Sequence, residues 1–301
     1  MTVIEHNVDG AELNVSLLSD LHIGSLHTDY RMIQRELDRA VANNAVIAIN
    51  GDILDAILPG DRKRYRASDL HPRMYEAGDD MVGEAIRWAA EILAPYASRI
   101  IMLGDGNHDD AVSRYHHIEP VKHLCVLLQN MTGYAVNYGG YHGFLHFRLK
   151  TTCGHRAHYV MHYHHGSGGG SAVTKGIGAF HRANAWIEGA DALWRGHTHT
   201  ITAGRDGKIV FNRDAHYQLN RVETKDVLSI RTGAYMDTYK AITPEELAKR
   251  GRKDSYAALW DCSNAPKGGS FLNLKAVAVD TAATRSTPRK TVYIVEDTLS
   301  I

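Results

Sequence analysis

Residues 46–55 read Val-Ile-Ala-Ile-Asn-Gly-Asp-Ile-Leu-Asp, an apolar run that ends in polar residues. An apolar run without alternating polar residues is typical of a strand that is buried on both faces of a sheet. Ligands of such sheets bind beyond the carboxyl ends of the strands. The segment therefore predicts a buried strand that delivers Asp52 to a functional site.

The same arrangement occurs on both sides of this segment. Residues 13–18 predict a buried strand that delivers Asp20, and residues 100–103 predict one that delivers Asn107 and His108. Apolar residues at helical spacing lie between and after these strands. They predict helices from the Asp29 cap to Asn43-Asn44, over 79–94 and over 120–129. This β-α-β-α-β order predicts a parallel or mixed sheet.

The second half of the chain changes character. A strand over 156–164 runs into His165-Gly166, and a helix over about 172–189 and a strand over 192–195 follow. Strand-like runs continue at 208–212, 227–231, 271–279 and 291–296. We expect one domain over 1–301 that contains two packed sheets. Its motif-bearing core is 13–200, and 201–301 forms a C-terminal second-sheet region.

Five polar motifs follow these strands in order along the chain. They are Asp20-Leu21-His22, Gly51-Asp52-Ile53-Leu54-Asp55, Gly106-Asn107-His108-Asp109, His165-Gly166 and Gly196-His197-Thr198-His199. Carboxylate and amide oxygens mixed with imidazoles suit Mn, Fe or Zn. The candidate ligands divide into two sets of four if Asp52 is shared, and they are Asp20, His22, Asp52, Asn107, His165, His197 and His199. Two such ions would activate a water molecule for in-line displacement.

Two further residues of these motifs are candidates for proton transfer. His108 lies between a predicted ligand and Asp109, and it is a spare imidazole that could protonate a leaving group. Asp55 follows Asp52 by three residues and could hold that imidazole in one tautomer. Taken singly, the aspartates and Asn107 could equally be turn or cap residues. Their combination with several histidines in this order argues against that alternative.

The ordered motifs resemble the calcineurin-like metallophosphoesterases. The resemblance implies an α/β fold, a four-layer α/β/β/α sandwich with two mixed sheets and a dinuclear metal site at the strand C-termini. It implies an enzyme that hydrolyses phosphoric esters with two divalent ions, with Mn²⁺ expected first and Fe or Zn as alternatives. By position, one ion would take Asp20, His22, Asp52 and His199, and the other Asp52, Asn107, His165 and His197. His108, with Asp55, occupies the place of the family's catalytic histidine.

The fourth motif leaves alternatives open. His162, His164 and His165 all precede Gly166 closely. We expect His165 to be the ligand because the family histidine precedes a glycine, with His164 as the second choice. Neighbours on a strand face opposite sides, so only one of these two can point to the metals. The run from Gly166 to Gly170 could cradle a phosphate, but a flexible connection to the next helix is the simpler interpretation.

The substrate is predicted from a cationic segment. Arg62, Arg64 and Arg66 follow the second motif, with Tyr65 between them, and Arg114 follows the third. Such charges are usually only solvated, but on the active-site side they could hold a phosphate-flanking group. We therefore expect a phosphodiester substrate, a nucleotide or a single-stranded nucleic acid. A phosphomonoesterase, acting on a protein or a small molecule, and a non-catalytic scaffold are the alternatives.

Composition limits the other classes. The 301 residues carry 34 basic and 34 acidic residues, so no global field favours a long duplex or a membrane partner. Three dispersed cysteines form no C-x-x-C motif, and the first ten residues lack an apolar core. These features predict a cytoplasmic protein. The 19 histidines, several of them paired near Asp and Gly, are unusual and favour metal chemistry.

Overall fold

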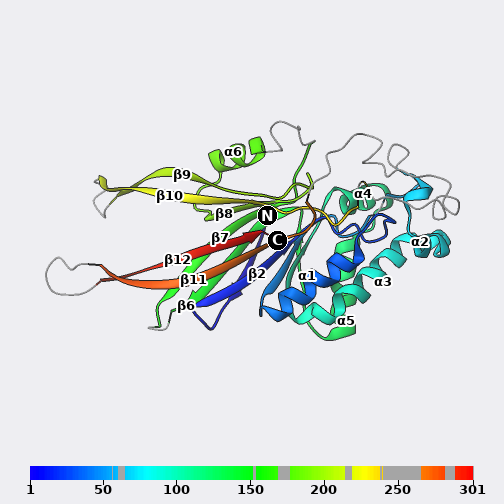
Figure 1. The fold of residues 1–301 in the computed structure, drawn as a ribbon, viewed down its shortest axis with the longest axis horizontal. Coiled ribbons are helices and arrows are strands. Elements are labelled where there is room, and N and C mark those ends of the chain that lie inside the picture. The colour runs from blue at the N-terminus through cyan, green and yellow to red at the C-terminus, as the bar shows by residue number, and fades with distance from the viewer. Residues whose placement is uncertain are drawn as a thin grey trace.

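Two six-stranded mixed sheets pack against each other at the centre of the molecule (Figure 1). The computed structural model describes residues 1–55, 57–59, 65–151, 154–168, 177–213, 219–237, 239, 266–281 and 289–300.

The first sheet contains the strands that precede the first three motifs. Its order is β12 (Arg289–Ser300), β11 (Ser270–Thr281), β2 (Glu12–Leu18), β3 (Val46–Asn50), β4 (Ile100–Gly104) and β5 (Asn137–Gly140). Strands β2 to β5 are parallel, and β11 and β12 are antiparallel additions at one edge. The carboxyl ends of β2, β3 and β4 therefore meet at one edge, as predicted. The short, glycine-containing β5 gave no strand signal.

The second sheet contains the strands that precede the last two motifs. Its order is β1 (Thr2–Asn7), β6 (His142–Lys150), β7 (Arg156–His164), β8 (Ala192–Arg195), β10 (Leu219–Arg231) and β9 (Thr202–Arg213). The sequence analysis predicted neither β1, in which only Ile4 is buried, nor β6, whose residues alternate between buried and partly exposed. The last hundred residues contribute to both sheets, because β9 and β10 join the second sheet while β11 and β12 join the first.

Helices cover both outer faces. The first sheet is covered by α1 (Tyr30–Ala42), α3 (Met81–Leu93) and α5 (Pro120–Thr132), and the second by α6 (Ile177–Trp186) (Figure 1). This arrangement confirms the predicted four-layer α/β/β/α sandwich. The remaining helical segments are α2 (Pro72–Glu76), α4 (Asn107–His116), η1 (Ala67–Asp69), η2 (Gly78–Asp80) and η3 (Ala94–Arg99). Residues 172–176 of the predicted 172–189 helix lie outside the described residues.

The predicted helix limits have local causes. The Asp29 carboxylate accepts a hydrogen bond from Met32 N at 3.1 Å and caps α1, which ends at Asn43. The three covering helices bury their apolar stripes on the first sheet, where Ile33, Ala89 and Leu124 are examples. A separate core fills the space between the sheets. In it, Val15 and Leu17 of β2 share a cluster with Met161 of β7 and Trp194 of β8.

In the part of the chain that the structure describes, no helix has both the length and the apolar character that crossing a membrane requires.

Candidate metal centre

The loops after β2 and β3 are joined to each other by backbone hydrogen bonds. Asp20 N donates to Gly51 O at 2.9 Å, and His22 N donates to Asp52 O at 3.0 Å. This ladder continues the parallel pairing of β2 and β3 beyond the strand ends. It therefore fixes the positions of two motifs relative to each other without any metal ion.

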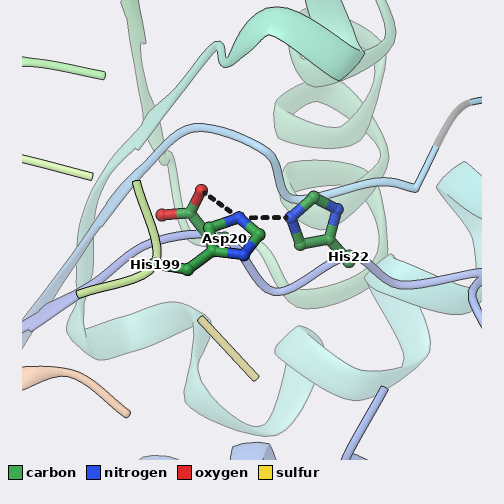
Figure 2. Close-up of side chains that lie close together, drawn as sticks. All are labelled: Asp20, His22 and His199. Carbon is green, nitrogen blue, oxygen red and sulfur yellow. Dashed lines mark hydrogen bonds and ion pairs between the residues drawn. The ribbon is translucent and has the colours of Figure 1, made fainter. Parts of the chain in front are cut away.

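One group of side chains at this edge consists of Asp20, His22 and His199. His199 lies between the other two (Figure 2), with its Nε2 3.4 Å from Asp20 Oδ1 and 3.3 Å from His22 Nε2. Asp20 and His22 are buried, whereas the His199 side chain is 37% exposed. Two close ring nitrogens beside a carboxylate form a donor set that a Mn, Fe or Zn ion would accept.

A second group consists of Asp52, His165 and His197. His165 Nε2 lies 3.2 Å from Asp52 Oδ2 and 3.8 Å from Asp20 Oδ1, so this imidazole connects the two groups. Asn107 joins the second group through His197, whose Nδ1 lies 2.7 Å from Asn107 Oδ1. The structure thus brings the seven predicted ligands close together, and their division between two ions stays a prediction.

A third group places the predicted catalytic pair beside the first two. Asp55 Oδ1 lies 3.4 Å from His108 Nδ1 and 3.2 Å from His22 Nδ1. His108 Nε2 faces Asp52 Oδ2 at 4.0 Å. Asp55 is therefore shared between two imidazoles, one a predicted ligand and the other the predicted proton donor.

The charges of this site are strongly coupled. Burial disfavours ionised Asp52, but His165 and His108 hold its pKa well below the usual range. Burial alone would lower the pKa of His165, but Asp52 and Asp20 raise it to about 10. Ionised carboxylates therefore persist in a buried site, where they need cations beside them.

Asp109 is a residue of the third motif whose role the sequence analysis missed. Its carboxyl group is fully buried and accepts from Ile53 N at 3.3 Å, Leu54 N at 3.3 Å and Gly106 N at 3.0 Å. These bonds connect the loop that carries Asp52 to the loop that carries Asn107. Burial and the nearby Asp52 raise the pKa of Asp109 to about 8. The feature of the sequence that could have indicated this role is the position of Asp109 directly after His108 in the third motif.

Asp52 also lies at the start of α4. The amide of His108, in the first turn of this helix, donates to Asp52 Oδ1 at 2.8 Å. A carboxylate at a helix N-terminus is stabilised by unpaired amides and by the helix dipole. The same first turn thus orients Asp52 and presents Asn107 and His108.

Two glycines of the motifs are required by close approach. A Cβ at Gly106 would overlap the Asp52 side chain and backbone amide. A Cβ at Gly51 would lie 2.5 Å from His165 Nδ1, and its φ of +81° also favours glycine. The glycines therefore allow the loops to come together at the site.

The three histidines of the fourth motif point in different directions. His165 is buried, and its Nδ1 lies 2.8 Å from Asn50 O, which directs Nε2 to the carboxylates. His164 points elsewhere, and its Nδ1 accepts a hydrogen bond from Gly166 N at 2.9 Å. His162 belongs to the same outer face of β7, where its ring contacts Phe144 and Trp186. The geometry places His165, and neither alternative, beside Asp52.

The structure describes two of the four predicted substrate residues, Arg66 and Arg114. Arg62 and Arg64 lie outside the described residues, as does part of the Gly166–Gly170 run. Arg66 precedes η1 and is partly exposed. Arg114 lies in the last turn of α4, where its side chain is 62% exposed and forms an ion pair with Asp110 at 2.9 Å. Contact of these residues with a substrate stays a prediction.

Comparison with known proteins gives a distant likeness. No protein-family model and no curated protein matches the chain. A similar solved structure is the calcineurin-like phosphoesterase YfkN from Bacillus subtilis, at 11% sequence identity and a TM-score of 0.39. The match covers 94% of this chain and 90% of that one. The function is therefore proposed from the residues of the site.

Proposed function

We propose that this protein is a metal-dependent phosphoesterase of the calcineurin-like type that holds two divalent ions. The observation that supports it is the pair of adjacent donor groups, Asp20-His22-His199 and Asp52-His165-His197. Their oxygen and imidazole donors fit Mn²⁺, Fe or Zn, and Asp52 and His165 lie where the groups meet. When bound, two ions would activate water and neutralise the phosphate oxygens.

The residues of the chain would perform the remaining work. Asp20, Asp52 and Asn107 would hold the ions with oxygen atoms, and the imidazoles would complete each set. His108 would donate a proton to the leaving oxygen, since its Nε2 faces the site while its Nδ1 faces Asp55. Asp55 would keep that ring in one tautomer and orientation.

We propose a phosphodiester, a short or cyclic nucleotide or a single-stranded end, as the substrate. The leaving group of a diester is an alkoxide, which a proton from His108 would stabilise; the same would hold for a monoester, so the flanking cations decide for the diester. The net charge of zero argues against a long duplex held through its backbone. Arg66 and Arg114 are the described cations that could contact a group flanking the phosphate.

The deciding experiment compares the hydrolysis of bis-p-nitrophenyl phosphate and p-nitrophenyl phosphate by the Mn²⁺-loaded protein. We expect a higher kcat/KM for the diester. A preference for the monoester would replace the substrate proposal with a phosphomonoesterase. No hydrolysis of either compound by protein that holds two Mn²⁺ would favour a scaffold and overturn the proposed activity.

Metal content provides a matched test of the ligands. Elemental analysis after reconstitution with Mn²⁺ should approach two ions per chain. His165→Ala should deplete metal, whereas His164→Ala, its neighbour on the same chain segment, should retain it. Metal loss in His164→Ala alone would reverse the assignment of the fourth motif.

We also infer that residues 1–301 form one domain. Each sheet takes strands from distant parts of the chain, because β1 pairs with β6 and β11 pairs with β2. Limited proteolysis should therefore give no stable fragment that contains only one sheet.

A further inference from the structure

The outer face of the second sheet, on the side of α6, carries a row of basic side chains at the ends of four neighbouring strands. His142 of β6 is in register with His164 of β7, which is in register with Arg195 of β8. Arg195 is in register with Arg231 of β10. We call His142, His164, Arg195 and Arg231 the basic row.

The basic row extends from solvent into the protein. His142 is exposed and His164 is partly buried, whereas Arg195 and Arg231 are only 6% and 1% exposed. The Phe180 ring of α6 lies over Arg231, with the guanidinium carbon 4.8 Å from the ring centre. Two guanidinium groups are therefore buried side by side, which is costly unless negative charge accompanies them.

No such charge is found beside Arg195 within the described ranges. There, no carboxylate forms an ion pair with its guanidinium, and the buried Nη1 has no hydrogen-bond partner. Burial and the neighbouring Arg231 lower the pKa of Arg195 to about 10. The metal centre, in contrast, contains three buried carboxylates among its histidines.

Further polar atoms of the same face lack a partner among the residues that the structure describes. They are the buried Nδ1 of His162 and the buried Oγ of Ser229. His162 lies two residues before His164 on β7, and Ser229 lies two residues before Arg231 on β10. In addition, His164 Nδ1 accepts from Gly166 N, so the ring proton lies on Nε2 and can be donated to a ligand. Arg195 therefore lies, without a carboxylate partner among the described residues, on a face that offers donors of several kinds.

We propose that the basic row binds a phosphate-type oxyanion, held by Arg195 with His164 as a further donor. Guanidinium groups match the oxygens of phosphate in a planar fork, and a buried charge-assisted hydrogen bond of this kind is strong. A metal ion would be repelled by two arginines. The site is separate from the metal centre and does not require the proposed hydrolytic activity.

The oxyanion site and the metal centre lie on opposite sides of the same strand ends. His164 precedes the candidate ligand His165, and Arg195 precedes Gly196 and His197. Side chains of consecutive residues on a strand point to opposite faces. The bound group could be free phosphate or a second phosphate of the substrate, because both present the same oxygens.

The first test is calorimetric titration of the Mn²⁺-loaded protein with inorganic phosphate. We expect binding in two classes, one lost in the metal-centre variant Asp52→Asn and the other in Arg195→Met. The Arg195→Met change should weaken the second class roughly 10- to 100-fold. Arg156→Met, which removes an exposed arginine from β7, is the control and should leave both classes unchanged. A single class that depends on Asp52 alone would overturn the proposal.

Thermal unfolding in the absence and presence of phosphate provides a second measurement. Because Arg195 is a buried charge that needs an anion, Arg195→Met should raise the Tm in phosphate-free buffer and should reduce the further rise on adding phosphate. If the guanidinium is instead held by a carboxylate of the protein, Arg195→Met should lower the Tm and leave the phosphate effect intact. That result would also overturn the proposal.

Kinetics distinguishes the two sources of the anion, and this arm alone rests on the proposed function. The substrates are a dinucleotide with a 5′-phosphate and the same dinucleotide without it. A rise in KM in Arg195→Met for the phosphorylated form alone would assign the site to the substrate. Unchanged KM values together with weakened phosphate binding would assign it to free phosphate. Either result supports the site.

Discussion

The two sheets contribute to the metal centre in different ways. The first sheet supplies all the carboxylates and the amide, on loops that hydrogen-bond to one another and to Asp109. The second sheet supplies only His165, His197 and His199, and the last two are partly exposed. Hydrogen bonds between loops thus hold the first-sheet side of the centre in place, whereas the second sheet contributes imidazole side chains.

The first sheet therefore supplies both the anionic groups and the contacts that position them, whereas the second sheet supplies imidazoles alone. The N-terminus of α4 and the β2–β3 ladder fix Asp52 and Asp20 before any ion binds. Histidines of the second sheet then approach these carboxylates from the side. We expect changes to the first-sheet loops to disrupt the whole centre, and changes at its periphery to have limited effects.

The largest effect is expected from Asp52→Asn. Asp52 is fully buried and faces His165, His22 and His108, so its loss removes the charge that both donor groups share. Metal content and activity should both fall, with activity reduced by about 10³-fold or more. Asp226→Asn, an exposed change on β10, is the control. Full activity in Asp52→Asn would contradict the shared-ligand assignment.

A large effect restricted to catalysis is expected from His108→Ala. The residue lies beside the groups that would hold metal, but its ring faces Asp55. The rate should fall about 10²- to 10⁴-fold while elemental analysis shows unchanged metal. His123→Ala, on the exposed side of α5, should change neither quantity. Loss of metal from His108→Ala would make it a ligand.

An intermediate effect is expected from Asp109→Ala. The change leaves three backbone amides without their acceptor and loosens the connection between the Asp52 and Asn107 loops. Metal affinity should fall about 10- to 100-fold, as for other residues that orient ligands. Asp110→Ala, on the next residue of α4, should retain wild-type affinity. Equal metal affinity in the two variants would show that the hydrogen bonds of Asp109 are not needed to position the first-sheet loops.

The smallest effect is expected from Arg114→Ala. Its side chain is largely exposed and already paired with Asp110, so it can add only about 1 kcal/mol or less to substrate binding. KM for a nucleotide diester should rise about two- to fivefold, with kcat unchanged. A drop in kcat of a hundredfold would place Arg114 at the reacting phosphate and contradict the peripheral role.

The sequence was informative where a buried strand ends in a motif. The strands before Asp20, Asp52 and Asn107, the α1 cap at Asp29 and the grouping of all seven candidate ligands were predicted from apolar runs and polar strand ends. Strand β1 was missed because Ile4 is the one buried residue among its six, whereas β6 does alternate, with Leu145, Phe147 and Leu149 facing inward, and this signal was not used. The role of Asp109 was missed because backbone contacts leave no periodic pattern.

The basic row was missed for a related reason. His142, His164, Arg195 and Arg231 are dispersed along the chain and become neighbours only through the register of four strands. Parallel pairing between β7 and β8 and between β8 and β10 depends on long connections, whose register sequence patterns do not specify.

The backbone of the metal centre has a consequence for the evolution and engineering of this protein. Five of the candidate ligands, Asp20, His22, Asp52, His197 and His199, have positive φ angles between 48° and 69°. Non-glycine residues in that region cost about 1–3 kcal/mol each, so the site holds conformational strain that the surrounding fold must balance. Selection for thermostability alone would favour glycine at these positions and would remove the ligands. A stability-based library should therefore recover inactive variants first, and screening must include metal content.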